Sequence, residues 1–142
     1  MTVAPAGPSP ATSPATDRER PLVLLVEDQP DLRQLYAEQL TLAGFDVLQA
    51  DNGESAIADT TAHAPDVVLM DLSLPVVDGW EATRRLKTDT RTAHIPVVAL
   101  TSHDGAGELE RVTSAGCDWF VPKPCQPDAL VSEVRRVLAA RR

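Results

Sequence analysis

The chain is poor in aromatic and basic residues and contains no long apolar run. Aromatic side chains make up 4% of its 142 residues, so a core must be built mainly from Val, Leu, Ile and Ala. The formal net charge of −8 argues against general affinity for nucleic acid, which requires clustered Lys and Arg. No run approaches the ~20 apolar residues of a membrane span, and no secretory signal is visible. These absences predict a cytoplasmic protein that binds neither nucleic acid nor membranes.

Cysteine is also scarce. Cys117 and Cys125 are the two cysteines, and they form no CxxC pair. If the residues between them form a strand at ~3.3 Å per residue, the two lie more than ~20 Å apart. A disulfide needs Cα atoms within about 7 Å, so we expect two reduced thiols.

Large apolar residues are nearly missing from residues 1–20, which are rich in Pro, Ala, Ser and Thr. Such a segment cannot bury enough surface to offset its loss of conformational entropy. We therefore predict a disordered tail over residues 1–20 and one folded domain over residues 21–142. The tail is either a functional tether or a leader without a role.

The rest of the chain alternates between two kinds of pattern. Apolar, β-type runs predict strands over 22–26, 45–50, 67–70, 95–100 and 117–121. Helical spacing predicts helices over 32–40, 54–63, 80–87, 108–114 and 128–140. The pattern of the first of these helices consists of Leu32, Leu35, Tyr36, Gln39 and Leu40. Five strands alternating with five helices indicate right-handed βαβ crossovers, hence an α/β fold with a doubly wound parallel sheet covered on both faces.

Polar residues follow four of these strands. Ligands of open parallel sheets bind at the carboxyl ends of the strands, so residues placed there should meet on one rim. The residues in question are Glu27, Asp28, Asp71, Thr101 and Lys123. Three clustered carboxylates repel one another unless a cation intervenes, and Mg²⁺ prefers such oxygen ligands.

A magnesium ion and Lys123 would bring the formal charge of this rim to about zero, so that a phosphoryl group could enter. Asp71 would then act as the nucleophile and form an acyl phosphate. Mg²⁺ and Lys123 would neutralise the equatorial oxygens, and Thr101 could donate to one of them. The backbone carbonyl of Ser73 is a candidate further metal ligand.

Five blocks in the chain resemble the receiver domain of two-component response regulators, in the order and spacing of that family. They are LVLLVEDQPD, LRQLYAEQLTLAGF, PDVVLMDLSLPVVDGWE, IPVVALTS and AGCDWFVPKP. The resemblance covers roughly 120 residues from about Pro21 onward. It implies a flavodoxin-like, three-layer sandwich with strand order 2-1-3-4-5.

The resemblance also implies roles for individual residues. Glu27 and Asp28 would bind Mg²⁺, and Asp71 would accept a phosphoryl group from a histidine kinase or a histidine phosphotransfer protein. Thr101 would be the switch hydroxyl and Phe120 the switch aromatic. Lys123 would contact the phosphate, and the peptide bond before Pro124 would be cis.

Regulation and partners follow from the same resemblance. The face of the fourth helix, last strand and last helix would bind a downstream protein, in a monomer or a weak phosphorylation-dependent dimer. Ser73 and His103 could border the path of hydrolytic water and tune the phosphate lifetime. Trp119 should face away from Phe120, either as an exposed partner anchor or packed against a helix.

Other interpretations remain for these residues. Glu27 and Asp28 could simply open the following helix, since acids favour helix N-termini. A haloacid-dehalogenase-type enzyme would need a second Asp at position 73, where this chain has serine. A nucleotide-binding unit would need a glycine-rich turn after the first strand. We therefore expect a signalling switch and not an enzyme, with an interaction module that works without phosphorylation as the alternative.

Overall fold

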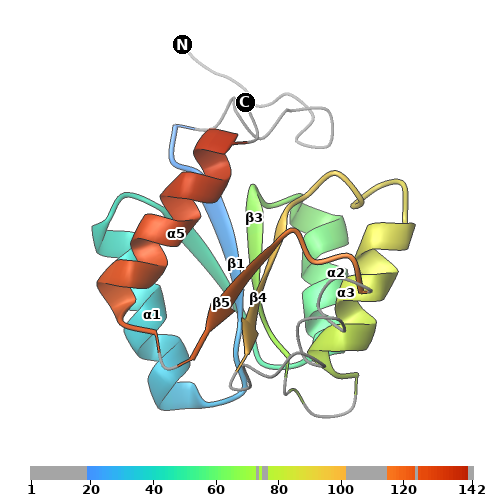
Figure 1. Ribbon diagram of the computed structural model, residues 1–142, viewed down its shortest axis with the longest axis horizontal. Helices are drawn as coiled ribbons and strands as arrows, with labels where there is room; N and C mark the ends of the chain where they lie inside the picture. The colour runs from blue at the N-terminus through green and yellow to red at the C-terminus, as the bar shows by residue number, and fades with distance from the viewer. Residues whose placement is uncertain (1–18, 73, 75–76, 102–114, 124, 141–142) are drawn as a thin grey trace.

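The computed structural model describes residues 19–72, 74, 77–101, 115–123 and 125–140 (Figure 1). Several sequence predictions fall outside this part of the chain. They are the tail up to residue 18, the helix over 108–114, and the positions of Ser73, His103 and Pro124.

Five strands and four helices alternate along the described chain. The strands are β1 (Leu22–Val26), β2 (Asp46–Ala50), β3 (Val67–Asp71), β4 (Val97–Thr101) and β5 (Trp119–Pro122). The helices are α1 (Pro30–Leu42), α2 (Gly53–His63), α3 (Gly79–Thr88) and α5 (Pro127–Ala140). Every predicted element within the described residues is therefore present.

Two strands, β4 and β5, begin two residues later than their apolar runs suggested. Pro96 has no N–H to donate, and the N–H of Ile95 donates to the Thr92 carbonyl at 3.0 Å, so β4 begins at Val97. Ahead of β5, the Asp118 carboxylate accepts the Val97 N–H at 2.8 Å and ion-pairs with Lys87 Nζ at 2.9 Å. The carboxylate takes the place of a backbone acceptor for the Val97 N–H, while the Asp118 N–H still donates to the Val97 carbonyl at 2.9 Å, and β5 begins at Trp119.

The five strands form one parallel sheet in the order β2-β1-β3-β4-β5, as predicted. Helices α1 and α5 cover one face of this sheet, and α2 and α3 cover the other (Figure 1). The polypeptide therefore folds into three layers, with the carboxyl ends of all five strands at one edge.

The core lies on both faces of the sheet because side chains alternate along each strand. In β1, Val23 and Leu25 join the cluster under α1 and α5, whereas Leu24 and Val26 join the cluster under α2 and α3. All four are 0% exposed, which explains why the strand reads as an unbroken apolar run.

Trp119 and Phe120 follow the same alternation. Trp119 packs against the cluster under α1 and α5, and Phe120 against the opposite cluster, so the predicted opposition of the two rings is confirmed. Trp119 is half-buried beside Val137 and Ala140 of α5, which favours packing against a helix over full exposure. Cys117 and Cys125 are free thiols, as expected.

One residue of the α1 pattern behaves differently. Leu35, which the helical spacing placed with the apolar face, is 42% exposed. Its neighbour Tyr36 is instead 2% exposed and belongs to the core cluster. Hydrophobic spacing locates the helix, but the packing angle against β1 and α5 decides which residues of a broad apolar stripe face inward.

Gly79, the first residue of α3, is pressed against the end of β3. A Cβ built there would lie 2.6 Å from the Cα of Leu72 and still closer to the Asp71 carbonyl oxygen. The Asp78 carboxylate caps this helix by accepting the Glu81 N–H at 2.9 Å. The Asp-Gly pair thus lets α3 begin in direct contact with the backbone of Asp71.

We expect Gly79→Ala to lower the free energy of unfolding by about 2 kcal/mol, because the added methyl group must displace backbone atoms. Urea denaturation measures this loss. The matched control is Glu54→Ala at the exposed start of α2, which should change stability by less than about 0.5 kcal/mol. Equal stability of the two variants would show that α3 can retreat from β3 at little cost.

Candidate functional site

The carboxyl ends of β1, β3, β4 and β5 bring the predicted rim residues together. Glu27 directly follows β1, Asp71 is the last residue of β3, Thr101 is the last residue of β4, and Lys123 directly follows β5. The parallel register places these four ends at one edge of the sheet, as the strand pattern predicted.

Three carboxyl groups converge on this rim. Glu27, Asp28 and Asp71 each offer one oxygen, and these oxygens lie within 4.8 Å of one another. Glu27 is 0% exposed and Asp71 3% exposed, whereas Asp28 is open to solvent. The cluster therefore has a buried floor and an accessible side, which suits a small cation that keeps some of its waters.

Lys123 contacts both buried carboxyl groups of the cluster. Its Nζ donates to Glu27 Oε1 at 2.8 Å and lies 3.6 Å from Asp71 Oδ2. Its backbone N–H donates to the Thr101 carbonyl at 2.6 Å, so β4 holds the residue at its main chain. The ammonium thereby bridges the ends of β1 and β3, which carry the two buried carboxyl groups.

Glu27 does not serve as the cap of α1. The N-cap of that helix is Gln29, and the acidic residue of its first turn is Asp31. Glu27 directs its side chain inward instead, where Oε2 accepts the Gln29 N–H at 3.3 Å and Oε1 accepts from Lys123. The interpretation of Glu27 as a helix-opening acid is therefore wrong for this chain.

Burial and charge act in opposite directions on the ion pair. Burial of Glu27 raises the pKa of its carboxyl, and this outweighs the lowering effect of the hydrogen bond from Lys123. Burial would lower the pKa of Lys123, but the hydrogen bond to Glu27 and the charge of Asp71 together raise it. Lys123 thus stays an ammonium at neutral pH.

One contact at the rim was missed by sequence reasoning. The Tyr36 hydroxyl donates to the Cys125 carbonyl at 2.8 Å, joining α1 to the segment that follows Lys123. The helical spacing had marked Tyr36 only as an apolar position. A buried tyrosine usually finds a polar partner for its hydroxyl, but nothing in the sequence pointed to a carbonyl 89 residues away.

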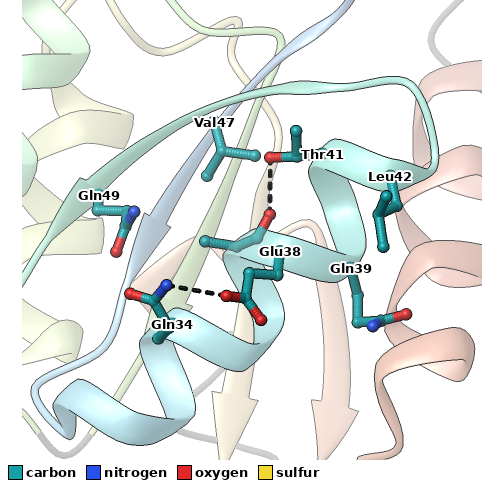
Figure 2. Close-up of a pocket in the computed structure, with 8 residues that line it drawn as sticks. Gln34, Glu38, Gln39, Thr41, Leu42, Val47 and Gln49 are labelled. Atoms are coloured by element: carbon teal, nitrogen blue, oxygen red, sulfur yellow. Dashed lines mark hydrogen bonds between the residues drawn. The ribbon is translucent and has the colours of Figure 1, made fainter.

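A groove also lies between α1 and β2, away from this rim. Figure 2 shows its lining, which includes Gln34, Glu38, Leu42 and Gln49. Gln34 Nε2 donates to Glu38 Oε2 at 3.0 Å along the groove wall. None of the rim carboxyl groups lines this groove, and its chemistry is unlike that of the clustered acids.

The family model for the response regulator receiver domain matches residues 23–135 of the chain. The chain belongs to the response regulator receiver family. Among curated relatives, the polar-differentiation response regulator DivK of Brucella anthropi is 33% identical over 116 residues, which cover 82% of this chain and 94% of DivK. The part that the two chains share therefore includes nearly the whole of that relative.

Solved receiver structures share the fold. The chemotaxis response regulator CheY4 of Vibrio cholerae matches with a TM-score of 0.79 at 26% identity, covering 83% of this chain and 98% of CheY4. The receiver domain of the sensor histidine kinase PA1611 from Pseudomonas aeruginosa matches with a TM-score of 0.75 at 30% identity, covering 85% and 96%. That structure holds a magnesium ion coordinated in its active site cleft.

Membership in the receiver family assigns the chain to two-component signalling and confirms the predicted flavodoxin-like sheet order. Receiver domains act as signalling switches. In the described part of the receiver, no helix is both long and apolar enough to cross a membrane.

We expect the Glu27 carboxyl to make the stability of the metal-free receiver depend on pH. Its folded pKa lies above the usual 4.5, so the folded receiver holds this proton more tightly than the unfolded chain does. The resulting stabilisation is complete below pH 4.5 and is lost as the pH rises through the raised pKa. The free energy of unfolding of Glu27→Gln should therefore fall less steeply than that of wild type as the pH rises. Urea unfolding between about pH 4 and pH 8 measures the difference.

The exposed substitution Glu54→Gln is the control and should follow the wild-type profile. Loss of the ionic partner of Lys123 should also lower the stability of Glu27→Gln across the whole pH range. Parallel pH profiles for wild type and Glu27→Gln would contradict the raised pKa.

Proposed function

We propose that this receiver accepts a phosphoryl group on Asp71 from the phosphohistidine of a histidine kinase or a histidine phosphotransfer protein. The observation that carries the proposal is the convergence of Asp71 with two further carboxyl groups and one ammonium. Lys123 Nζ lies 3.6 Å from Asp71 Oδ2, and the oxygens of Glu27, Asp28 and Asp71 lie within 4.8 Å of one another.

The donor set fits magnesium as the cofactor. Mg²⁺ is bound by one or two carboxylates and retains several waters, and this cluster offers carboxylate oxygens with an open side at Asp28. Glu27, Asp28 and Asp71 would hold the ion, with the Ser73 carbonyl as a further proposed ligand. When bound, the ion supplies positive charge for the phosphoryl oxygens.

Asp71 performs the covalent step. One of its carboxylate oxygens forms a bond to phosphorus as the bond from phosphorus to the donor imidazole nitrogen breaks, and the released imidazole takes up a proton. Lys123 offers its ammonium to an equatorial phosphoryl oxygen, 3.6 Å from the acceptor carboxylate in the starting state. The nearly buried Asp71 is shielded from solvent, which strengthens this attraction.

Thr101 and Phe120 transmit the effect of phosphorylation at Asp71 to the rest of the receiver. Thr101 is 2% exposed at the end of β4, and its carbonyl holds the main chain of Lys123, so movement of this residue reaches β5 directly. Phe120 lies in β5, paired with Ala99 of β4. We propose that phosphorylation shifts the side chains of Thr101 and Phe120. This shift alters the face made by the predicted helix over 108–114, β5 and α5, where a downstream protein binds.

The other sequence predictions stay proposals. They are a tail over residues 1–20 and a domain over 21–142, a cis bond before Pro124, tuning of the phosphate lifetime by Ser73 and His103, and a monomer or weak dimer in the cytoplasm. The alternative is an interaction module that works without phosphorylation. The joint presence of Asp71, its acidic neighbours and Lys123 favours phosphorylation, because a binding surface alone does not require them.

Incubation with Mg²⁺ and a small acyl phosphate should add one phosphate to the intact protein. Asp71→Asn and removal of Mg²⁺ should each abolish the gain, because the first removes the nucleophile and the second leaves the phosphoryl charge uncompensated. Intact-mass spectrometry measures the gain directly.

The matched control is Asp46→Asn, an exposed acid at the start of β2 whose salt bridge to Arg20 is a surface contact. It should be phosphorylated like wild type. Failure of wild type to gain phosphate from either an acyl phosphate or a cognate kinase would refute the proposal and favour the interaction module. Turnover of a phosphorylated small molecule would instead indicate an enzyme.

Magnesium should stabilise the folded receiver because the unfolded chain does not hold the three carboxylates together. At a concentration one hundred times the dissociation constant, the gain is about 2.7 kcal/mol, measurable by urea unfolding with and without a chelator. Asp28→Asn should lose most of this gain, whereas Asp46→Asn should keep it. The same gain in Asp28→Asn as in wild type would place the ion elsewhere.

A further inference from the structure

The proposed chemistry leaves one buried polar group of the rim without a role. Tyr36 lies in the second turn of α1, is 2% exposed, and donates its hydroxyl to the Cys125 carbonyl at 2.8 Å. A phenylalanine ring would fill the same apolar space. The hydroxyl is therefore not needed for packing, and its contribution lies in where it holds residue 125.

Cys125 lies two residues after Lys123, in the short connection between β5 and α5. The main chain ahead of it is fixed, because the Lys123 N–H donates to the Thr101 carbonyl at 2.6 Å. Beyond it, the Gln126 carbonyl accepts the Leu130 N–H at 2.9 Å in the first turn of α5. Tyr36 supplies a contact between these two anchor points, from a different layer of the fold.

These contacts form a closed circuit around the rim. Glu27 Oε1 accepts from Lys123 Nζ, the chain runs from Lys123 to Cys125, and the Cys125 carbonyl accepts from Tyr36. Helix α1 then leads from Tyr36 back to its start at Pro30, three residues after Glu27. Figure 1 shows α1 beside the β5–α5 connection at the lower left of the sheet.

The circuit links the acidic pair to the lysine by a path that does not run through the ion pair itself. When a phosphoryl group arrives, the Lys123 ammonium must leave Glu27 in part and turn toward the new oxygens. A main chain held at both Thr101 and Tyr36 keeps the ammonium within reach during that change, because ordering beforehand avoids a cost in the transition state.

We propose that the Tyr36 hydroxyl is a positioning residue for Lys123, holding the β5–α5 connection so that the ammonium meets the phosphoryl group on Asp71. This role rests on the proposed function of the receiver. It does not require Tyr36 to touch the phosphoryl group or the metal.

The test substitution is Tyr36→Phe, which keeps the ring and removes the hydroxyl. The rate of phosphorylation by a small acyl phosphate in saturating Mg²⁺ should fall roughly two- to tenfold, the range expected for one net hydrogen bond. In a Lys123→Ala background the same substitution should have no further effect, because the group that Tyr36 positions is gone.

Thr92→Val is the matched control. Thr92 is 1% exposed, and its hydroxyl donates to the Leu86 carbonyl at 2.7 Å, ahead of β4 and so at the opposite edge of the sheet. Thr92→Val removes this short hydrogen bond and a longer contact with the Asp89 carbonyl at 3.4 Å, so its loss of stability should be at least that of Tyr36→Phe. Its phosphorylation rate should match wild type.

Hydrogen exchange at the Lys123 amide provides a second readout that needs no phosphate. This amide should exchange faster in Tyr36→Phe than in Thr92→Val once overall stability is taken into account. Unchanged exchange of the Lys123 amide in Tyr36→Phe would overturn the positioning role of Tyr36. Equal slowing of phosphorylation by Thr92→Val would overturn it too, as would a further slowing when Tyr36→Phe is added to Lys123→Ala.

The two proposals fail in distinguishable ways. A wild-type receiver that takes up no phosphate refutes the proposed function, and the positioning role with it. A wild type that is phosphorylated, with a Tyr36→Phe variant of the same rate, refutes only the positioning role.

Discussion

Two buried carboxyl groups, those of Glu27 and Asp71, share one ammonium, that of Lys123, at the end of the sheet. Such an arrangement is costly to desolvate, and it persists only when the surrounding structure holds each group firmly. The parallel sheet provides that support, because β1 and β3 are direct neighbours and end side by side. Their pairing runs from Val23 opposite Val67 to Val26 opposite Met70. Lys123 reaches the same point from β5 through its main-chain bond to β4. Much of the local architecture serves to keep these charges within reach of one another.

The apolar layers restrict movement of the central strands and so help to fix the charged groups at their ends. β1, β3 and β4 are covered on both faces, so their ends cannot shift without disturbing two clusters of tightly packed side chains. Gly79 adds a local constraint, since α3 begins in contact with the backbone of Asp71 and Leu72. The result is a buried floor at Glu27 and Asp71 beside one exposed acid, Asp28. A switch that reads small changes in charge needs such a floor.

Tyr36 adds to this arrangement a contact from outside the sheet. Glu27, Asp71, Thr101 and Lys123 lie at or next to strand ends, where the sheet itself positions them. The segment after Lys123 is a connection and depends on contacts from other layers for its position. A hydroxyl on α1 that reaches the Cys125 carbonyl couples the helix after the acidic pair to the segment after the lysine. In this way the layer formed by α1 and α5 takes part in the chemistry of the rim without contributing a group to it.

The sequence by itself determined the strands, the four described helices, the sheet order by family resemblance, and the positions of Glu27, Asp71, Thr101 and Lys123 at strand ends. Apolar runs and their spacing are local signals, and parallel pairing then brings strand ends together without further information. Tertiary structure decided that Glu27 pairs with Lys123 and does not open α1, that Leu35 is exposed while Tyr36 is buried, and that the Tyr36 hydroxyl finds residue 125. These outcomes depend on the angle and distance at which layers pack. Tyr36 and Cys125 are 89 residues apart and Glu27 and Lys123 are 96 residues apart, so no local sequence pattern predicts that either pair is in contact.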